Sequence, residues 1–382
     1  MSKLFAEFRM GDTTLKNRIV MAPLTRSRAP DDAADERVAL YYAQRATAGL
    51  IVSEGTPISR EGQGYLFNPG IFTAEQIAGW RLTTHSVHAA GGKMFAQIWH
   101  VGRVSHPSIQ EGGKLPVSAS SKQAVGATAF GYDADGKPAL VAPPAPRQLT
   151  TAEVARIVGE FAQAAENAIE AGFDGVEIHG ANGYLFEQFM NPLVNDRTDQ
   201  YSADQLENRL RFTLQVIDAV VARIGAGRVG IRISPYGQLF DMPLYEQIDE
   251  TYTALASEIG ARQLAYVHVM DQSGFPAPGT EGGGGGPKAT FINLLSTMKS
   301  KLPDTALILA GGMSRQRAQD LINDGLIDLA VFGTAYISNP DLVARLENNW
   351  PLTEAKRETF YGGGAAGYVD YAPHQGQAIA TW

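Results

Sequence analysis

The sequence predicts a (β/α)8 barrel, or TIM barrel, that forms a single domain over residues 1–382. Short β-rich runs alternate with helical patterns from one end of the chain to the other, and no linker separates them. Most of the runs are apolar on both faces, as expected for parallel strands that are covered by helices. The predicted strands are 18–23, 50–55, 93–99, 175–179, 229–233, 265–269, 306–310 and 328–332.

The helices between these strands are marked by apolar spacing and by capping residues. From Thr150 to Gly172, apolar residues recur at helical spacing, and Thr150 with Glu153 forms a candidate capping box. Gly172 is typical of the end of such a helix. Asn339 and Pro340 predict the start of the last barrel helix, as its N-cap and its first residue.

The chain is longer than a plain barrel, which takes about 250 residues. Residues 1–16 are expected to form a hairpin that caps the barrel floor. Residues 100–149, rich in Gly, Pro and Ser, are too long for a plain loop and are expected to fold over the top after the third strand. Residues 270–288 include the consecutive glycines Gly282–Gly286 and predict a mobile loop. A disordered surface loop and a working lid are equally good interpretations of these glycines.

Composition excludes several classes of function. The net charge of −8 argues against nucleic acid and against an anionic membrane surface as partners. The absence of cysteine excludes disulfides, thiolate chemistry and cysteine-ligated metal centres, and no other metal site is predicted. No signal region or membrane-spanning run is evident, so a cytoplasmic protein is expected. One sequence leaves the oligomeric state open.

The fourth predicted strand runs directly into the segment His179–Tyr184, which is the candidate catalytic site. In TIM barrels, catalytic groups lie at the carboxyl ends of the strands. His179, Asn182 and Tyr184 offer an imidazole, a carboxamide and a phenol. These uncharged hydrogen-bonding groups suit a carbonyl oxygen together with a proton donor better than they suit a metal ion.

Other strand ends carry candidates that are weaker when taken alone. Thr25 follows the first strand, although most threonines at such positions are local turn formers. Gly55 ends the second strand, where a backbone amide could approach a planar ligand closely. Gln97 and Trp99 share one face of the third strand. A lone glutamine there is more often a satisfied core amide.

Arg232 lies between two isoleucines in the fifth predicted strand. A buried arginine is costly unless it meets an anion. A structural interpretation pairs it with Glu177. The functional interpretation, which we favour, makes it the counter-charge for an electron-rich ring.

Glycines follow the last two strands, where TIM barrels often bind phosphate. Gly311 and Gly312 follow the seventh strand, and Gly333 with Thr334 follows the eighth. Their free amides predict a phosphate cradle. Together with the hydrogen-bond donors and the buried cation, this cradle predicts a phosphorylated aromatic cofactor. Gly362–Gly367 matches G-x-G-x-x-G but follows no strand, so it does not predict a dinucleotide site.

Several separate motifs occur in one order along the chain: Leu15–Arg18, Met21–Arg26, Gly91–Pro107, His179–Gln188, Arg197–Asp199, Glu207–Arg209 and Phe360–Tyr371. With these motifs, the chain resembles the old yellow enzymes, FMN-dependent ene-reductases of the N-ethylmaleimide reductase type. The resemblance implies tightly but non-covalently bound FMN, and NADPH or NADH as the reductant. It also implies reduction of the C=C bond of α,β-unsaturated carbonyl compounds and related activated alkenes, with nitro compounds or nitrate esters as further candidates.

The resemblance implies a role for each candidate residue. Tyr184 would protonate the α carbon while N5 of FMN delivers hydride to the β carbon. His179 and Asn182 would hold the carbonyl oxygen. Arg232 would neutralise charge at N1 and O2 of the reduced ring, and Gln97 would bond its pyrimidine edge. The other cofactor-binding residues would be Pro23, Leu24, Thr25, Gly55, Gly311, Gly312, Gly333 and Thr334. The walls of the substrate pocket, in which phenolic ligands are also expected to bind, would be Tyr65, Trp99 and Tyr361.

Thr334 departs from the family pattern, which usually has Gly-Arg after the eighth strand. A hydroxyl then replaces a bidentate cation at the phosphate, so FMN would bind less tightly unless Arg315 compensates.

The alternative function is that of a non-flavin barrel enzyme acting on a sugar phosphate. It would share the phosphate cradle but would need a carboxylate base or a Schiff-base lysine, and no predicted strand end supplies one well placed.

Overall fold

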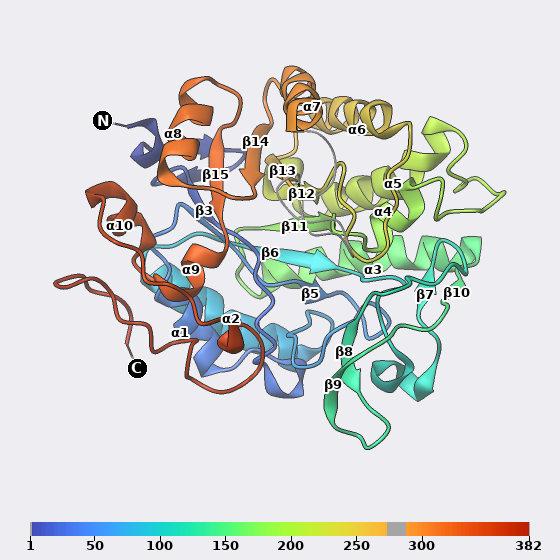
Figure 1. Ribbon diagram of the computed structural model, residues 1–382, viewed down its shortest axis with the longest axis horizontal. Helices are drawn as coiled ribbons and strands as arrows, with labels where there is room; N and C mark the ends of the chain where they lie inside the picture. Colours follow the sequence, from blue (N-terminus) through green and yellow to red (C-terminus); the bar gives the residue numbers. More distant parts are fainter. Residues whose placement is uncertain (1, 273–287, 382) are drawn as a thin grey trace.

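The computed structural model describes residues 2–272 and 288–381, and a closed barrel of eight parallel strands lies at its centre (Figure 1). Neighbouring strands along the chain pair with each other, and the last pairs with the first, which closes the ring. The predicted TIM barrel is therefore confirmed, and every predicted strand overlaps an observed one. The barrel strands are β3 (Ile19–Met21), β4 (Leu50–Val52), β6 (Met94–Trp99), β11 (Gly175–Gly180), β12 (Val229–Ile233), β13 (Tyr266–Met270), β14 (Ala306–Ala310) and β15 (Leu329–Phe332).

Helices surround the barrel (Figure 1). Among the described residues, no helix is long and apolar enough to cross a membrane. The helices are α1 (Glu36–Ala43), α2 (Ala74–Ala89), α3 (Thr151–Glu170), α4 (Leu185–Met190), α5 (Leu206–Ile224), α6 (Ile248–Arg262), α7 (Lys288–Ser300), α8 (Arg315–Asn323), α9 (Thr334–Ser338) and α10 (Leu342–Asn348).

Two predicted helix starts have different outcomes. The capping box of α3 is confirmed, because the Glu153 N–H donates to the Thr150 hydroxyl at 3.2 Å and the Thr150 N–H donates to the Glu153 carboxylate at 2.8 Å. The start predicted at Asn339 is wrong, since α10 begins at Leu342. The Asn339 side chain instead exchanges hydrogen bonds with the backbone of Thr353, at 2.8 and 3.0 Å, and so is not available to cap a helix.

The N-terminal hairpin lies against the barrel floor, as predicted. It consists of β1 (Phe8–Met10) and β2 (Thr13–Leu15). Asp12 lies in the turn of this hairpin, and its N–H donates to the carbonyl of Gly227, just before β12, at 3.1 Å. Met10 is fully buried and belongs to the cluster that fills the barrel interior.

The excursion after the third barrel strand contains short strands and single turns of helix. It comprises η3 (Pro107–Ile109), η4 (Glu111–Gly113), β7 (Val117–Ser118), β8 (Ala129–Tyr132), β9 (Pro138–Val141) and β10 (Arg147–Gln148). A bridge between Tyr65 and Phe130 joins this excursion to the loop after the second barrel strand. Of the predicted Gly-rich loop, residues 273–287 lie outside the described residues.

The barrel interior changes from apolar at the floor to polar at the mouth. Side chains of alternate strand residues point inward, and those near the floor form one buried apolar cluster. This cluster includes Val20, Leu50, Phe95, Tyr266, Ile308 and Leu329. Nearer the mouth, Gln97 pairs in register with Glu177, and Arg232 pairs with His179 and His268. One side of the barrel therefore carries buried polar groups.

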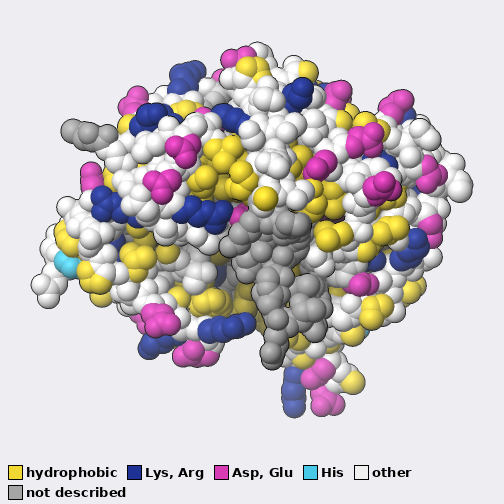
Figure 2. Space-filling model, turned by 45° about the horizontal axis from the view of Figure 1, so that its top comes forward, with side chains coloured by type: hydrophobic (Ala, Val, Ile, Leu, Met, Phe, Trp, Pro, Cys, Tyr) yellow, Lys and Arg dark blue, Asp and Glu magenta, His cyan; other side chains and the backbone are white. Residues whose placement is uncertain are grey.

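The face shown in Figure 2 carries acidic and basic side chains interspersed, with hydrophobic side chains visible in its hollowed central part.

A C-terminal segment returns to the barrel and is held by two arginines that follow β3. The fully buried Arg26 donates to the carbonyl oxygens of Phe360 at 2.8 Å and Gly367 at 2.9 Å. Arg28 donates to the carbonyl oxygen of Thr359 at 2.6 Å. The glycine run of this segment therefore forms turns around two guanidinium groups.

We expect Arg26→Met to lower the free energy of unfolding by about 3 kcal/mol, because buried carbonyl groups would lose their donor. Arg37→Met is the control, since Arg37 makes a partly exposed pair with Asp35 and its loss should cost about 0.5 kcal/mol or less. Denaturant unfolding followed by circular dichroism measures both. Equal, small effects would contradict the anchoring role of Arg26.

Candidate active site

The three candidate catalytic residues meet at the mouth of the barrel, where β11 ends. His179 and Tyr184 are almost fully buried, at 2% and 5% exposed, and their ring centroids lie 5.1 Å apart. The turn between them needs left-handed backbone, with φ of 59° at Asn182 and 77° at Gly183. A Cβ at position 183 would lie 2.4 Å from the carbonyl oxygen of Leu239, which is too close for any side chain. The glycine is therefore required by a close approach.

His179 is held as a neutral hydrogen-bond donor. Burial, followed by the positive charges of Arg232 and His268, lowers the pKa of His179 well below its ordinary value. The imidazole is therefore neutral near pH 7. Its Nδ1 accepts the N–H of Ala181 at 3.3 Å, so Nε2 carries the ring proton.

Asn182 is oriented by two contacts from other strands. Its Oδ1 accepts from Nε2 of Gln272, just after β13, at 2.8 Å. Its backbone N–H donates to Oγ of Ser234, after β12, at 2.7 Å. Because the carbonyl oxygen of the amide is engaged by Gln272, the Nδ2 amino group is the part free to donate. Gln272 was not among the predicted site residues, and the only sequence signal for it was a polar residue directly after a strand.

Tyr184 keeps its proton over the physiological pH range. Burial, followed by the neighbouring Tyr65, raises the pKa of Tyr184 well above its ordinary value. The hydroxyl oxygens of Tyr184 and Tyr65 lie 3.0 Å apart.

Aromatic rings surround this phenol. Trp99 stacks on Tyr65 at 5.6 Å between ring centroids and meets Tyr184 edge-on at 5.1 Å. Phe240, in the loop after β12, lies 5.3 Å from Tyr184; no sequence motif pointed to it. Tyr361 is 67% exposed but lies close enough to add to the raised pKa of Tyr65 and Tyr184. The structure thus brings the predicted pocket-wall residues together.

Arg232 and Glu177 share the barrel interior without a direct contact. Glu177 accepts from Nε2 of Gln97 at 2.7 Å and contacts Nδ1 of His268 at 2.8 Å. Burial raises the pKa of Glu177, but the charge and hydrogen bond of His268, with Arg232 and Gln97, outweigh it, and the pKa is lowered. Among the described residues, Arg232 donates only to the sulfur of Met270, and its buried Nε has no partner. The predicted structural pair with Glu177 is therefore not formed.

The glycines after the last two strands lie at the same edge of the barrel. Gly311 has φ of 116°, and a Cβ there would lie 2.3 Å from the carbonyl oxygen of Asp271. Around Gly333 there is more room, since a Cβ would meet only Leu24 and Ala22, at 3.8 Å. Pro23, Leu24 and Thr25 are half-buried beside this opening.

Two residues considered for the cofactor site also have contacts within the protein. Trp99 packs closely on Gly55, because a Cβ at Gly55 would lie 2.6 Å from the indole. The guanidinium of Arg315 lies 5.9 Å from the ring of Phe5, in the N-terminal turn η1 (Lys3–Phe5). Thr334 is exposed at the first position of α9. Arg317 lies beside Gly312 instead.

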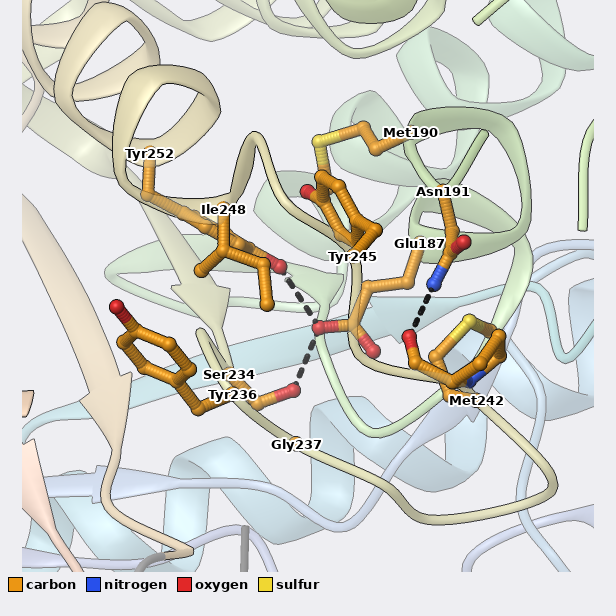
Figure 3. Close-up of a pocket in the computed structure, with 11 residues that line it drawn as sticks. Glu187, Met190, Asn191, Ser234, Tyr236, Gly237, Met242, Tyr245, Ile248 and Tyr252 are labelled. Atoms are coloured by element: carbon orange, nitrogen blue, oxygen red, sulfur yellow. Dashed lines mark hydrogen bonds between the residues drawn. The ribbon is translucent and has the colours of Figure 1, made fainter. Parts of the chain in front are cut away.

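Glu187, in α4, lies against the turn that carries Asn182 and Gly183. Figure 3 shows its carboxylate between Ser234 and Tyr252, whose hydroxyls donate to it at 2.6 and 3.0 Å. Its other oxygen accepts the N–H of Gly183. Since Ser234 also accepts the N–H of Asn182, one carboxylate fixes both residues of the turn. The motif His179–Gln188 contained Glu187, but nothing local indicated this contact.

Comparison with protein families decides the class of the protein. The model of the NADH:flavin oxidoreductase / NADH oxidase family matches residues 3–353. The chain belongs to this family. Similar proteins include putative 12-oxophytodienoate reductase 2 and 12-oxophytodienoate reductase 1 of Oryza sativa subsp. japonica. They are 42% and 41% identical over 96% of this chain, and the matches cover 93% and 92% of their lengths.

Solved structures of similar shape include morphinone reductase, with a TM-score of 0.91 and 41% identity over 97% of this chain and 96% of that chain. An old yellow enzyme homologue from Zymomonas mobilis has a TM-score of 0.89 and 37% identity, with coverage of 97% and 99%. The predicted membership of the old yellow enzyme family is confirmed. So are the flavin oxidoreductase class, the FMN cofactor and a nicotinamide reductant. The family decides against the non-flavin sugar-phosphate enzyme.

The residues present fit FMN at both ends of the mouth. Nε of Arg232 and Nε1 of Trp99 are buried polar atoms without a partner among the described residues. Such groups are costly unless a ligand or water satisfies them. Gly311 and Gly312 both have left-handed backbone, and a Cβ would lie 2.3 Å from the carbonyl oxygen of Asp271 at the first and 3.3 Å from Nη1 of Arg317 at the second. A turn without side chains beside a cation suits a phosphate cradle.

Glu187 should make stability depend on pH. Burial, opposed by its hydrogen bonds, raises the pKa of Glu187 to about 7. A carboxyl group with a higher pKa in the folded chain stabilises it most at low pH, and this contribution is lost as the pH rises to about 7. We expect the difference in unfolding free energy between the wild type and Glu187→Gln to fall by roughly 2 kcal/mol from pH 5 to pH 8.

Glu153→Gln is the matched control for this experiment. Its carboxylate bonds Arg147, which with the Thr150 N–H lowers the pKa of Glu153 to about 2, below the tested range. The corresponding difference should stay constant from pH 5 to pH 8. A constant difference for Glu187→Gln as well would show that Glu187 is already ionised at pH 5.

Proposed function

We propose that this protein is an ene-reductase that reduces the C=C bond of α,β-unsaturated carbonyl compounds at the expense of NADPH or NADH. The observation that carries the proposal is the donor set of His179, Asn182 and Tyr184. Each is neutral, and His179 and Asn182 are fixed in the donor sense by a second partner. Similarity to a 12-oxophytodienoate reductase and to morphinone reductase supports a carbonyl-bearing substrate.

His179 and Asn182 would bind the carbonyl oxygen of the substrate. Nε2–H of the imidazole and Nδ2–H of the amide both donate to it and stabilise the negative charge that develops there. Because both donors are held by the fold, little reorganisation is needed as the charge grows. The substrate oxygen is the group that these residues recognise, so nitroalkenes, nitrate esters and phenolic ligands are further candidates for the same place.

Tyr184 would supply the proton. Its hydroxyl is protonated throughout the physiological range and donates to the α carbon as the bond is reduced. Tyr65 can then donate to the phenolate oxygen of Tyr184 across the 3.0 Å contact. Trp99, Tyr65, Phe240 and Tyr361 would exclude water and hold the alkene flat.

The proposed cofactor residues surround the rest of the mouth. When bound, FMN supplies the hydride for the β carbon. Arg232 would place an unengaged cation beside the ring, and Gln97 would bond its polar edge. The remaining contacts would come from Pro23, Leu24, Thr25, Gly55, Gly311, Gly312, Gly333 and Thr334. The cytoplasmic location stays a prediction.

Tyr184→Phe separates proton donation from the rest of the reaction. We expect the bleaching of the flavin by NADPH without oxygen to be unchanged, because the phenol has no part in it. Reoxidation by cyclohexenone should slow by about 100-fold or more. Stopped-flow absorbance measures both half-reactions. Tyr65→Phe removes the partner hydroxyl and should slow reoxidation far less. If Tyr184→Phe left both half-reactions unchanged, the donor assignment would be wrong.

Gln272→Glu tests the orientation of Asn182. A carboxylate at position 272 accepts hydrogen bonds, so Asn182 would turn its amino group toward it and present Oδ1 to the substrate. We expect a phenol such as 4-hydroxybenzaldehyde to bind at least about 10-fold more weakly than to the wild type, as measured by titration of the flavin spectrum. Asn182→Ala gives the size of the full loss. Unchanged affinity in Gln272→Glu would count against this role of Gln272.

A further inference from the structure

Arg317, in the first turn of α8, places its guanidinium beside the glycines after β14. One of its N–H groups donates to the carbonyl of Gly311, and Nη2 pairs with the carboxylate of Asp271 at 2.7 Å. Nη1 lies 3.3 Å from the point where a Cβ of Gly312 would stand. The side chain is 32% exposed, so it is anchored at the mouth and also open to a ligand.

The edges of β14 and β15 set a single place for a phosphate. Ile308 pairs in register with Leu329. Gly312 and Gly333 each follow four residues later, so the two glycines face the same opening from neighbouring strands. A cation beside Gly312 and one at position 334 would therefore reach the same ligand oxygen atoms.

We propose that Arg317 binds the phosphate of FMN, in place of the arginine that the family pattern has at the position of Thr334. A guanidinium has five N–H donors, and the two anchors use only part of them. The anchors also fix its position before a ligand arrives, which lowers the entropy cost of binding. Arg315, which the sequence suggested, has its guanidinium against Phe5.

The test compares two ligands that differ only in the phosphate. The full-length protein, stripped of flavin, is titrated with FMN and with riboflavin, and binding is followed by the quenching of flavin fluorescence. Arg317→Ala should weaken the binding of FMN by about 10- to 100-fold, as expected for the loss of a hydrogen-bonded ion pair. The affinity for riboflavin should be unchanged. Arg315→Ala is the matched control from the same helical turn and should change neither affinity.

Two further variants separate phosphate binding from local structure. Asp271→Asn removes the ion pair but keeps Arg317 and its contact with the carbonyl of Gly311, so FMN affinity should fall far less than in Arg317→Ala. Thr334→Arg added to Arg317→Ala restores a cation at the same opening and should recover most of the lost FMN affinity.

The proposal is overturned if Arg317→Ala weakens the binding of FMN and of riboflavin equally, or if it weakens the binding of neither. It is also overturned if the wild type binds both ligands equally well. These readouts measure binding alone, so they stand apart from any result on alkene reduction.

Discussion

The carboxylate of Glu177 is the charge on which the polar side of the barrel depends. It is fully buried, and its oxygens are taken by Gln97 and His268. It can therefore compensate the charge of Arg232 through the low-dielectric interior without capturing the guanidinium. A direct ion pair would have used the donors of Arg232. Charge balance without contact leaves this arginine available at the mouth.

The turn that carries Asn182 and Gly183 is held by contacts from several elements. Asn182 adopts a left-handed conformation that costs free energy for any residue other than glycine. That cost is offset by Glu187 from α4, Ser234 from the end of β12 and Gln272 from the end of β13. Ser234 and Glu187 accept the backbone N–H groups of Asn182 and Gly183, and Gln272 donates to Oδ1 of Asn182. The Nδ2 amino group of Asn182 is therefore the donor that remains.

Much of this architecture could be predicted from local signals, and the exceptions share one cause. The barrel strands, the capping box at Thr150 and the donor set after β11 depend on periodicity and short motifs, which are visible in the chain. The contacts of Gln272 and Arg317 join segments 90 and 46 residues apart, and no periodicity records them. Asn339 failed as a helix start for the same reason, because the distant Thr353 engages its side chain.

Burial explains why the site suits a neutral oxygen acceptor. It lowers the pKa of His179, whose charged form is protonated, and raises the pKa of Tyr184, whose charged form is deprotonated. The same desolvation thus keeps both groups neutral over a wide pH range. A carboxylate substrate would meet no full positive charge from these groups. A carbonyl oxygen, which gains charge only as the bond is reduced, would meet dipoles already held in place. Neutral donors therefore favour the transition state over the bound ground state.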